Sequence, residues 1–500
     1  MRNAEEHKKL LAQIAELEKI SVNYFDVEKE FFLITSDNLD KVQSKFYGYS
    51  IQRDGIYEED NLTPEAIKNL DGRGCYVYVE VRDGKITIKQ DINGCWGIYI
   101  FRSGDYFALS NSFFRLLDYV KFKYPLTVNR DYCNYHMIEG LSTKSYFQTA
   151  INEVQLLDRN SILQIEIASK SFEIEIMTHK EHTIFIDSEE GIHALDSWVE
   201  FWGNLLRRVS QNTKFFSADL SGGFDSRIAF VPLLYSGIDL NTIRINSAND
   251  NLYSHKEDYA VASKIAKHYD FKLNRPTPSS HSLNYSLVDI FNMDFYTLQP
   301  VHTQIYVKLQ KSVEKRYNLN GFCGETVRGY WNVPTKEFIA NQKLRGRGYP
   351  RHLSDELKRS VEDILASGFN IIRNKYEIED PNSRDIPQYL YKEAWSRSHH
   401  GKEVVSFQFA NFISLSPVLD PKLRMLRLYT PECRDHNLLV AFIFARYEPD
   451  LLTFPFSSSH LIAPETIEYA KKINEQFPRR PKDVVEVTRG GGAFHLFLVD

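Results

Sequence analysis

The sequence predicts an α/β protein of two domains, a β-rich α+β domain over residues 1–188 and a parallel-sheet domain over residues 189–500. Three patterns support this division. In the first part, short segments alternate apolar and polar residues, as half-buried antiparallel strands do. After Ile186, apolar strands alternate with amphipathic helices, which is typical of a parallel sheet covered by helices. Beyond Trp331 the periodicity is mostly helical, so the second domain is expected to end in a helical part.

The first domain is expected to form short antiparallel strands after one amphipathic helix. In this helix, over residues 1–20, Leu10, Ile14 and Leu17 share one face. The dipeptide Asp83-Gly84 separates two alternating segments and is typical of a tight hairpin turn. The expected strands are CYVYVEV, KITIKQ, GIYIF, YFALS and the stretch SILQIEIASKSFEIEI.

The second domain is expected to alternate strands and helices around one sheet. The predicted strands are FFSADL, LNTIRIN and YNLNG. An apolar helix that ends at Gly237 follows the first strand, and a helix over residues 301–316 is expected to lead into the last one. A long helix precedes the first strand, because one of its faces carries Leu195, Trp198, Trp202, Leu205 and Val209.

Composition excludes several classes of protein. The 61 basic and 66 acidic residues give a formal charge of −5, which argues against a protein that mainly coats nucleic acid. The five cysteines form no CxxC pair, so neither a zinc ribbon nor a disulfide framework is indicated. The apolar runs are too short to span a membrane, and the N-terminal segment is too charged for a secretory signal. We therefore expect a soluble, cytoplasmic protein without a nucleic-acid or membrane partner.

The segment Ser221-Gly222-Gly223-Phe224-Asp225-Ser226 carries the strongest functional signal, because it lies between a predicted strand and an apolar helix. Two glycines let the backbone approach a ligand, and the N–H groups at a helix start attract anions. Asp225 would repel a bare phosphate, which suggests a bound Mg²⁺. The segment therefore indicates a polyphosphate site without the lysine of a Walker loop. A glycine turn capped by serine is the alternative.

The string SGGFDS resembles the pyrophosphatase loop of the N-type ATP pyrophosphatases, which cleave ATP between its α and β phosphates. Three further segments are similar to the asparagine synthetase and β-lactam synthetase family. They are LNGFCGETVRGY at 319–330, with one deletion, HKEDYAVASKIAKHY at 255–269, and SPVLD at 416–420. The match extends over about residues 195–455. The resemblance implies that residues 189–500 form an ATP pyrophosphatase domain that uses ATP and Mg²⁺.

The first domain resembles the glutamine-hydrolysing domain of the same family, which has an Ntn-hydrolase-like α+β fold. The family's nucleophile is a cysteine directly after the initiator methionine, where this chain has Arg2. Exposing Cys75 or Cys95 as a new N-terminus would remove the strands that contain them. We therefore expect a degenerate domain without glutaminase activity. The residues at matching positions are Gly74, Asp91, Gly94 and Tyr99.

The resemblance implies an AMP-forming amide ligase. A small carboxylate, with a sugar acid favoured, would attack the α-phosphate to form an acyl-adenylate and release pyrophosphate. Ammonia or an amine would then attack the activated carbonyl. The nitrogen would come from free ammonia, a small amine, or a partner that supplies ammonia. A homodimer through the N-terminal sheet is left undecided by the sequence.

The resemblance also implies roles for individual residues. Asp225 and Glu325 match the acidic ligands of Mg²⁺, with Glu325 one methylene longer than its counterpart. Arg227 is expected to pair with a phosphate or a substrate carboxylate, or else with a surface acid. With Asp225 and Glu325 it completes the expected catalytic set. The expected nucleotide-binding set is Ser221, Gly222, Gly223, Asp225, Ser226, Ile245, Asn320 and Gly321. Two alternatives are an exposed loop carboxylate for Glu325 and a strand-end turn residue for Asn320.

Several positions depart from the family pattern. Phe322 stands where β-lactam synthetase has a tyrosine and asparagine synthetase a glutamate, so it cannot transfer a proton and is expected to shape the acyl pocket. Cys323 has no activating base nearby and is not expected to be catalytic. Two alternative functions stay open, an enzyme of the same loop class that acts on RNA, and a non-catalytic nucleotide-binding scaffold. The candidates for the late adenylation lysine of the family are Lys471, Lys472 and Lys482.

Overall fold

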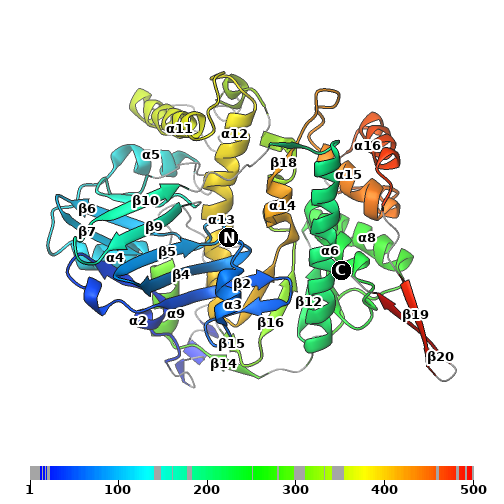
Figure 1. The fold of residues 1–500 in the computed structure, drawn as a ribbon, viewed down its shortest axis with the longest axis horizontal. Coiled ribbons are helices and arrows are strands. Elements are labelled where there is room, and N and C mark those ends of the chain that lie inside the picture. Colours follow the sequence, from blue (N-terminus) through cyan, green and yellow to red (C-terminus); the bar gives the residue numbers. More distant parts are fainter. Residues whose placement is uncertain are drawn as a thin grey trace.

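The computed structural model shows a mixed α/β protein with several sheets (Figure 1). It describes residues 23–139, 148–159, 161–176, 183–250, 252–276, 281–297, 310–331, 333–339, 354–457, 461–479, 484–489 and 492–497, with Pro278 and isolated residues between 9 and 19. The three apolar positions predicted for the first helix, Leu10, Ile14 and Leu17, lie outside the described residues. Within the described part, no helix combines the length and the apolar character that crossing a membrane requires.

Two antiparallel sheets make up the N-terminal part. Their strand orders are β10-β9-β5-β4-β2-β3 and β1-β7-β6-β8. Side chains of both sheets, such as Ile88 and Leu109, are buried in one apolar cluster. The strands are β1 (Leu33–Thr35), β2 (Lys45–Gln52), β3 (Gly55–Tyr57), β4 (Gly74–Arg82), β5 (Lys85–Gln90), β6 (Tyr99–Ser103), β7 (Tyr106–Ser110), β8 (Val154–Leu156), β9 (Ser161–Glu166) and β10 (Phe172–Ile176). The helices are α2 (Val27–Glu30), α3 (Pro64–Lys68), α4 (Phe113–Val120) and α5 (Arg130–Glu139).

The predicted hairpin is confirmed. β4 and β5 pair antiparallel, with Arg82 opposite Lys85, so that two residues form the turn. Both of these residues, Asp83 and Gly84, have positive φ values of 51° and 75°. A two-residue turn with this backbone follows the right-handed twist of the strands, which explains why an Asp-Gly dipeptide stands here.

The predicted parallel sheet is also confirmed. Its order is β13 (Arg244–Asn246), β12 (Phe216–Asp219), β16 (Arg316–Leu319) and β17 (Phe412–Leu415), and every neighbouring pair is parallel. The helices α6 (Glu189–Asn212), α7 (Phe224–Tyr235) and α8 (Tyr253–His268) precede or follow its strands. Along β12, Phe216 and Ala218 are buried, whereas Ser217 and Asp219 are only partly buried. One face of this sheet therefore packs in the core and the other is polar.

Two elements differ from the sequence predictions. The expected helix over residues 301–316 is wrong at its end, because Gln310–Ser312 form strand β15, which pairs with β14 (Ser282–Asn284). Residues 301–309 lie outside the described part. Strand β17 was not predicted, because it has only four residues, and a pattern this short does not distinguish a strand from a helix.

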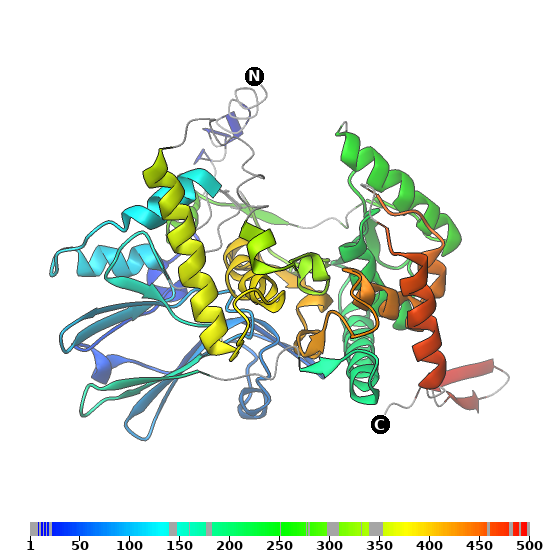
Figure 2. The same ribbon diagram turned by 90° about the horizontal axis from the view of Figure 1, so that it is seen from above.

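Helices dominate the rest of the chain, as predicted. Figures 1 and 2 place α13 between the N-terminal sheets and the parallel sheet, and it contacts both β4 and β17. The helices are α9 (Leu287–Thr297), α11 (Asp355–Lys375), α12 (Asp385–Leu390), α13 (Ser396–Phe409), α14 (Pro421–Arg424), α15 (Leu438–Tyr447) and α16 (Pro464–Gln476), with a π-helical turn at Tyr391–Trp395. The remaining strands form two pairs, β11 (Ile184–Phe185) with β18 (Leu426–Arg427) and β19 (Val484–Arg489) with β20 (Gly492–Phe497).

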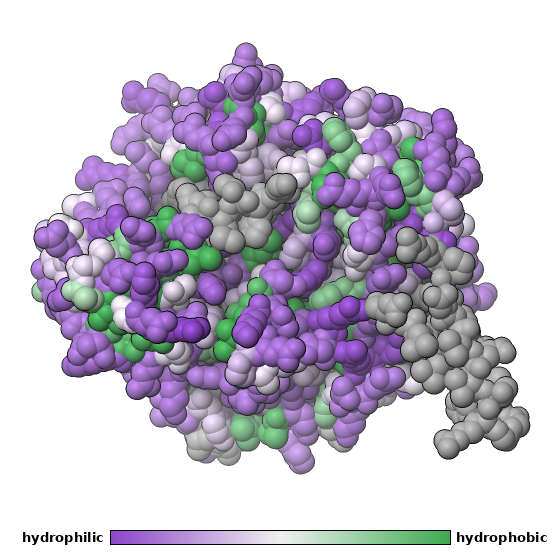
Figure 3. All heavy atoms as spheres, viewed as in Figure 1, coloured by the Kyte–Doolittle hydropathy of each residue, from purple (hydrophilic) through white to green (hydrophobic). Residues whose placement is uncertain are grey.

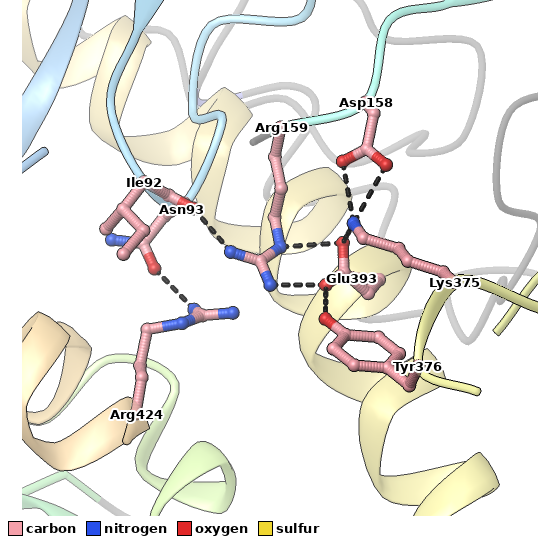
Figure 4. A network of polar contacts seen from close by, with 8 residues as sticks. All are labelled: Ile92, Asn93, Asp158, Arg159, Lys375, Tyr376, Glu393 and Arg424. Carbon is pink, nitrogen blue, oxygen red and sulfur yellow. Dashed lines mark hydrogen bonds and ion pairs between the residues drawn. The ribbon is translucent and has the colours of Figure 1, made fainter. Parts of the chain in front are cut away.

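A buried network of charges joins the N-terminal part to the helical part (Figure 4). Arg159 donates through Nε to Glu393 at 2.7 Å and through a second nitrogen to the other carboxylate oxygen. Lys375 lies 2.8 Å from Asp158 and 3.2 Å from Glu393. The hydroxyl of Tyr376 also donates to Glu393. The carboxylate of Glu393 therefore contacts two cations and a phenol. These contacts are buried, because the side chain of Glu393 is only 1% exposed.

Candidate functional site

The predicted loop lies between β12 and α7, as the sequence pattern requires. The N–H group and the hydroxyl of Ser221 both lie 2.9 Å from the hydroxyl of Ser226, so the loop closes on itself. Gly223 is the N-cap of α7, and no side chain caps this helix. The backbone N–H groups of the first turn are therefore directed at the loop opening, where an anion would be stabilised.

Helix α8 contributes a carboxylate that fixes the loop. Asp258 accepts the N–H of Gly222 at 2.9 Å and the hydroxyl of Ser457 at 2.7 Å. A Cβ atom at Gly222 would lie 2.8 Å from the Cβ of Ser457, which explains the glycine at this position. The sequence places Asp258 in a segment that resembles the family, but its contact with the loop was not predicted.

Asp225 and Glu325 lie on either side of an arginine, Arg328. The Nε atom of Arg328 is 3.0 Å from one oxygen of Asp225, and a terminal nitrogen is 3.1 Å from the other. The same terminal nitrogen group lies 3.6 Å from Glu325. Tyr391 donates its hydroxyl to the second oxygen of Glu325 at 2.9 Å. The structure thus brings the two predicted acidic residues together, but through a guanidinium that sequence reasoning missed.

Close backbone packing makes this arrangement possible. A Cβ atom at Gly321 would lie 2.3 Å from the carbonyl carbon of Asp225, and one at Gly324 would lie 2.0 Å from its Cγ. Between these glycines, Cys323 adopts a left-handed φ of 62°. The loop after β16 can therefore approach the start of α7 only because both positions lack a side chain.

Burial and charge set the protonation of the groups around Asp225. Burial raises the pKa of Asp225 to about 7, the positive charge of Arg328 opposes this shift, and the negative charge of Glu325 adds to it. Burial also raises the pKa of the Cys323 thiol well above its ordinary value, and Glu325 adds to this. A thiolate at Cys323 is therefore disfavoured at neutral pH, in agreement with the expectation that this cysteine is not a nucleophile.

The geometry around Asp225 and Glu325 bears on whether these two residues can bind a magnesium ion between them. Two carboxylates are suitable ligands for Mg²⁺. However, the guanidinium of Arg328 already contacts both oxygens of Asp225 and approaches Glu325. A divalent cation bound by both carboxylates would have to share their space with another cation. In this arrangement the residues do not fit a magnesium ion that bridges Asp225 and Glu325.

Removing Arg328 is expected to create a divalent-cation site. In Arg328→Ala, two carboxylates would face each other without a cation, and hard oxygen ligands of this kind bind Mn²⁺ and Mg²⁺. Electron paramagnetic resonance without nucleotide should show stoichiometric Mn²⁺ binding to this variant and none to the native protein. Adding Asp225→Asn should abolish the binding. A native protein that itself binds Mn²⁺ through Asp225 would contradict this interpretation.

Arg227 is not where the sequence analysis predicted. Its side chain is fully buried, and its guanidinium donates to the carbonyl oxygens of Gly222 at 3.0 Å, Leu451 at 3.3 Å and Phe454 at 3.4 Å, and also to that of Pro455. The prediction that Arg227 pairs with a phosphate or a substrate carboxylate is therefore wrong. Arg227 instead ties the segment after α15 to the loop, a contact between distant residues that no local pattern reveals.

The other predicted residues line or support the sheet ends. The side-chain amide of Asn320 donates to Ser414 at 2.8 Å and to Asn318, so it joins β16 to β17, as the strand-end alternative predicts. Ile245 is buried in β13.

Of the candidate lysines, Lys471 and Lys472 are exposed on α16, and Lys482 lies outside the described residues. The Glu325 side chain is 37% exposed, as the alternative of an exposed loop carboxylate expects, and it also contacts Arg328 and Tyr391.

One of the matching positions of the N-terminal part, Asp91, has a structural role. Asp91 is buried and accepts the N–H groups of Tyr76 at 3.2 Å, Asn93 at 2.9 Å and Cys95 at 3.1 Å. The thiols of Cys75 and Cys95 are buried beside it, and burial raises the pKa of Cys75. This carboxylate therefore organises the turn after β5.

Comparisons with known proteins identify no family. No family model matches the chain, and no curated protein matches it. Among solved structures, the chain is similar to glutamine phosphoribosylpyrophosphate amidotransferase from B. subtilis, complexed with ADP and GMP. The two share 12% identity over 76% of this chain and 72% of that chain, with a TM-score of 0.15. At that score the similarity of the two folds is weak, and no function is transferred from it.

Proposed function

We propose that the protein is an ATP-dependent, AMP-forming carbon–nitrogen ligase. It would activate a small carboxylic acid as an acyl-adenylate and pass the acyl group to ammonia or an amine. The observation that carries this proposal is the uncapped N-terminus of α7, which follows β12 and faces the glycine loop after the neighbouring strand β16. Ligands of open parallel sheets bind outside the carboxyl ends of neighbouring strands.

In this proposal the loop binds the phosphates of ATP. The N–H groups of the first turn of α7 and the hydroxyls of Ser221 and Ser226 act as donors, and magnesium enters bound to ATP as part of the substrate. The acid's carboxylate oxygen attacks the α-phosphorus, and the bond to the bridging oxygen breaks to release pyrophosphate. The amine then attacks the acyl carbon, AMP leaves, and the amine's proton passes to water. Catalysis consists mostly of positioning and charge neutralisation.

Arg328 supplies part of that neutralisation. It holds Asp225 and Glu325 in place and offsets their negative charge where a polyanion has to approach. Without this cation, two carboxylates beside the loop would repel ATP. Asp225 and Glu325 are therefore proposed as residues that position Arg328 toward the phosphates.

The test is pyrophosphate release by the full chain with Mg-ATP, ammonia and a panel of carboxylic acids, uronic acids included. We expect release that depends on one acid and is accompanied by AMP. Asp225→Ala should lower this rate by about 100-fold or more, in the range known for removing one preorganised electrostatic group. Glu468→Gln, which changes an exposed carboxylate on α16, should leave the rate unchanged. Native-rate release from Asp225→Ala would exclude this loop as the site.

A second candidate is a non-catalytic nucleotide-binding scaffold. It is favoured by the position of Arg328, which takes the space where two acidic residues would hold a metal. Calorimetry separates the two proposals. The scaffold predicts Mg-ATP binding without acid-dependent pyrophosphate release, whereas the ligase predicts both.

A further inference from the structure

The polar face of the parallel sheet borders a cavity of about 380 Å³. This volume lies within the usual range of small-molecule sites. Four strands contribute to its floor, and α13 contributes Glu403 and Phe407 to its wall. Figure 3 shows one face of the whole molecule, which is mostly hydrophilic with apolar side chains scattered over it. None of the residues Ser221 to Ser226 of the phosphate loop lines this cavity.

Strand register orders the side chains along the cavity. Asp219 of β12 is level with Asn246 of β13, at the end nearest the loop. Ser217 is level with Arg244 on one side and Asn318 on the other. Arg316 lies two residues before Asn318, which places it about 6.6 Å further from the loop. The cavity therefore has an amide- and carboxyl-lined end near the loop and a cationic end away from it.

The end near the loop carries groups that can bind hydroxyls. The amide nitrogen of Asn246 donates to Asp219 at 3.2 Å, and that of Asn318 donates to Ser217 at 3.1 Å. The side-chain amide oxygen of Asn246 is buried, and among the described residues it has no hydrogen-bond partner. Burial raises the pKa of Asp219, while hydrogen bonds from Asn246 and Asn318 oppose this. A buried acceptor without a partner is costly, and a ligand hydroxyl would relieve that cost.

The far end is built to bind an anion. The guanidinium of Arg316 lies 5.3 Å from the ring centre of Phe412 and 5.9 Å from that of Phe215, and its Nε donates to Ser312 at 3.1 Å. These contacts restrict its position. Arg244 and the exposed Lys214 add positive charge to the same lining. The lining carries three positively charged side chains and only two carboxylates, those of Asp219 and Glu403. The cavity is therefore expected to attract anions.

The adenosine part of ATP does not match this distribution of charge in the cavity. If the phosphates of ATP occupy the loop, the nucleoside that extends from them carries no charge for the cationic end to bind. The cavity meets the proposed reaction centre at Phe322, which lines it and follows the glycine packed against Asp225. A ligand that fills the cavity would therefore reach from Arg316 toward the loop.

We propose that the cavity binds the body of the acid that the loop activates, and that this acid carries hydroxyl groups and a second anionic group. Arg316 and Arg244 bind the second anion, Asn246 and Asp219 bind the hydroxyls, and the reacting carboxylate lies near Phe322. This inference rests on the proposed function, because it assumes that the loop binds ATP. It narrows the substrate to a sugar acid, or a similar polyhydroxylated acid, that carries a second anionic group.

Calorimetry on the full chain tests the proposal with three probes: glucuronic acid 1-phosphate, glucuronic acid and Mg-ATP. The acid with the second anionic group, glucuronic acid 1-phosphate, should bind about tenfold tighter than glucuronic acid, as one additional charge-assisted contact predicts. Arg316→Gln and, independently, Arg244→Gln should remove this difference and leave Mg-ATP binding unchanged. The matched control is Arg82→Gln, which changes an arginine that is 77% exposed on β4 and should alter nothing.

Two results would overturn the assignment. If Arg316→Gln weakens Mg-ATP as much as the acid, the cavity belongs to the nucleotide. If neither acid binds to a native protein that does bind Mg-ATP, the cavity is not the acid site. Failure of the proposed function is a different result, which the release assay gives: no acid on the panel would then support pyrophosphate release.

Discussion

Replacing Glu393 with alanine is expected to destabilise the protein by about 3–5 kcal/mol, the usual cost of removing one partner from a buried ion pair. The variant would leave much of the positive charge of Arg159 and Lys375 uncompensated. This is costly because the side chains of these residues are buried, at 0% and 8% exposure. Asp158 would still pair with Lys375 but could not reach both cations in the same geometry (Figure 4). The unfolding midpoint in urea should fall accordingly.

An exposed ion pair gives the matched control. Lys471 and Glu468 on α16 lie 2.9 Å apart, with side chains 49% and 72% exposed. Exposed pairs of this kind contribute at most about 1 kcal/mol, so Glu468→Gln should scarcely move the midpoint. If Glu393→Ala unfolds at the same urea concentration as Glu468→Gln, the buried network does not join the two parts of the chain as described.

Gly324→Ala is expected to lower acid-dependent pyrophosphate release by about 100-fold, because misplacing a reacting group by about 1 Å can have an effect of that size. The new Cβ would stand 2.0 Å from the Cγ of Asp225 and 2.2 Å from its oxygen, so either that carboxylate or the loop after β16 must move. Arg328 is held by the same carboxylate and would move with it. Rates are measured under the conditions that the native protein requires, with circular dichroism to verify folding.

Gly55→Ala controls for the substitution itself. A Cβ at Gly55 would meet no atom within 4 Å, so this variant should release pyrophosphate at the native rate. A folded Gly324→Ala protein with native activity would show that the close approach of the loop to Asp225 is unnecessary for the reaction.

Much of the fold could be predicted from local patterns. The turn at Asp83-Gly84 needs two positive φ values, a requirement that few dipeptides meet, and the structure confirms it. The strand–loop–helix unit around Ser221 was predicted for the same reason, since glycines, serines and an apolar run each restrict the backbone. The division of the chain at residues 188 and 189 stays a prediction, although α6 begins at Glu189. Strand β17 was missed because four residues carry too little pattern.

The site was predicted less completely, because its geometry depends on contacts between distant segments. Asp225 and Glu325 were paired through a resemblance, but no local pattern indicates that Arg328 lies between them. Arg227 was expected to face the ligand because it follows the loop. It faces the opposite way because α7 turns its side chain toward the carbonyl groups of residues 451–455. Helical phase shows which residues share a face, but it does not show what that face contacts.

The central claim is that the acid attacks the α-phosphorus of ATP, and the fate of the acid's oxygen tests this most directly. The acid that supports pyrophosphate release is labelled with ¹⁸O in its carboxyl group, and the products are analysed by ³¹P nuclear magnetic resonance and mass spectrometry. An acyl-adenylate mechanism predicts one ¹⁸O atom in AMP and none in pyrophosphate. Label in inorganic phosphate together with ADP, or AMP without label, would contradict it.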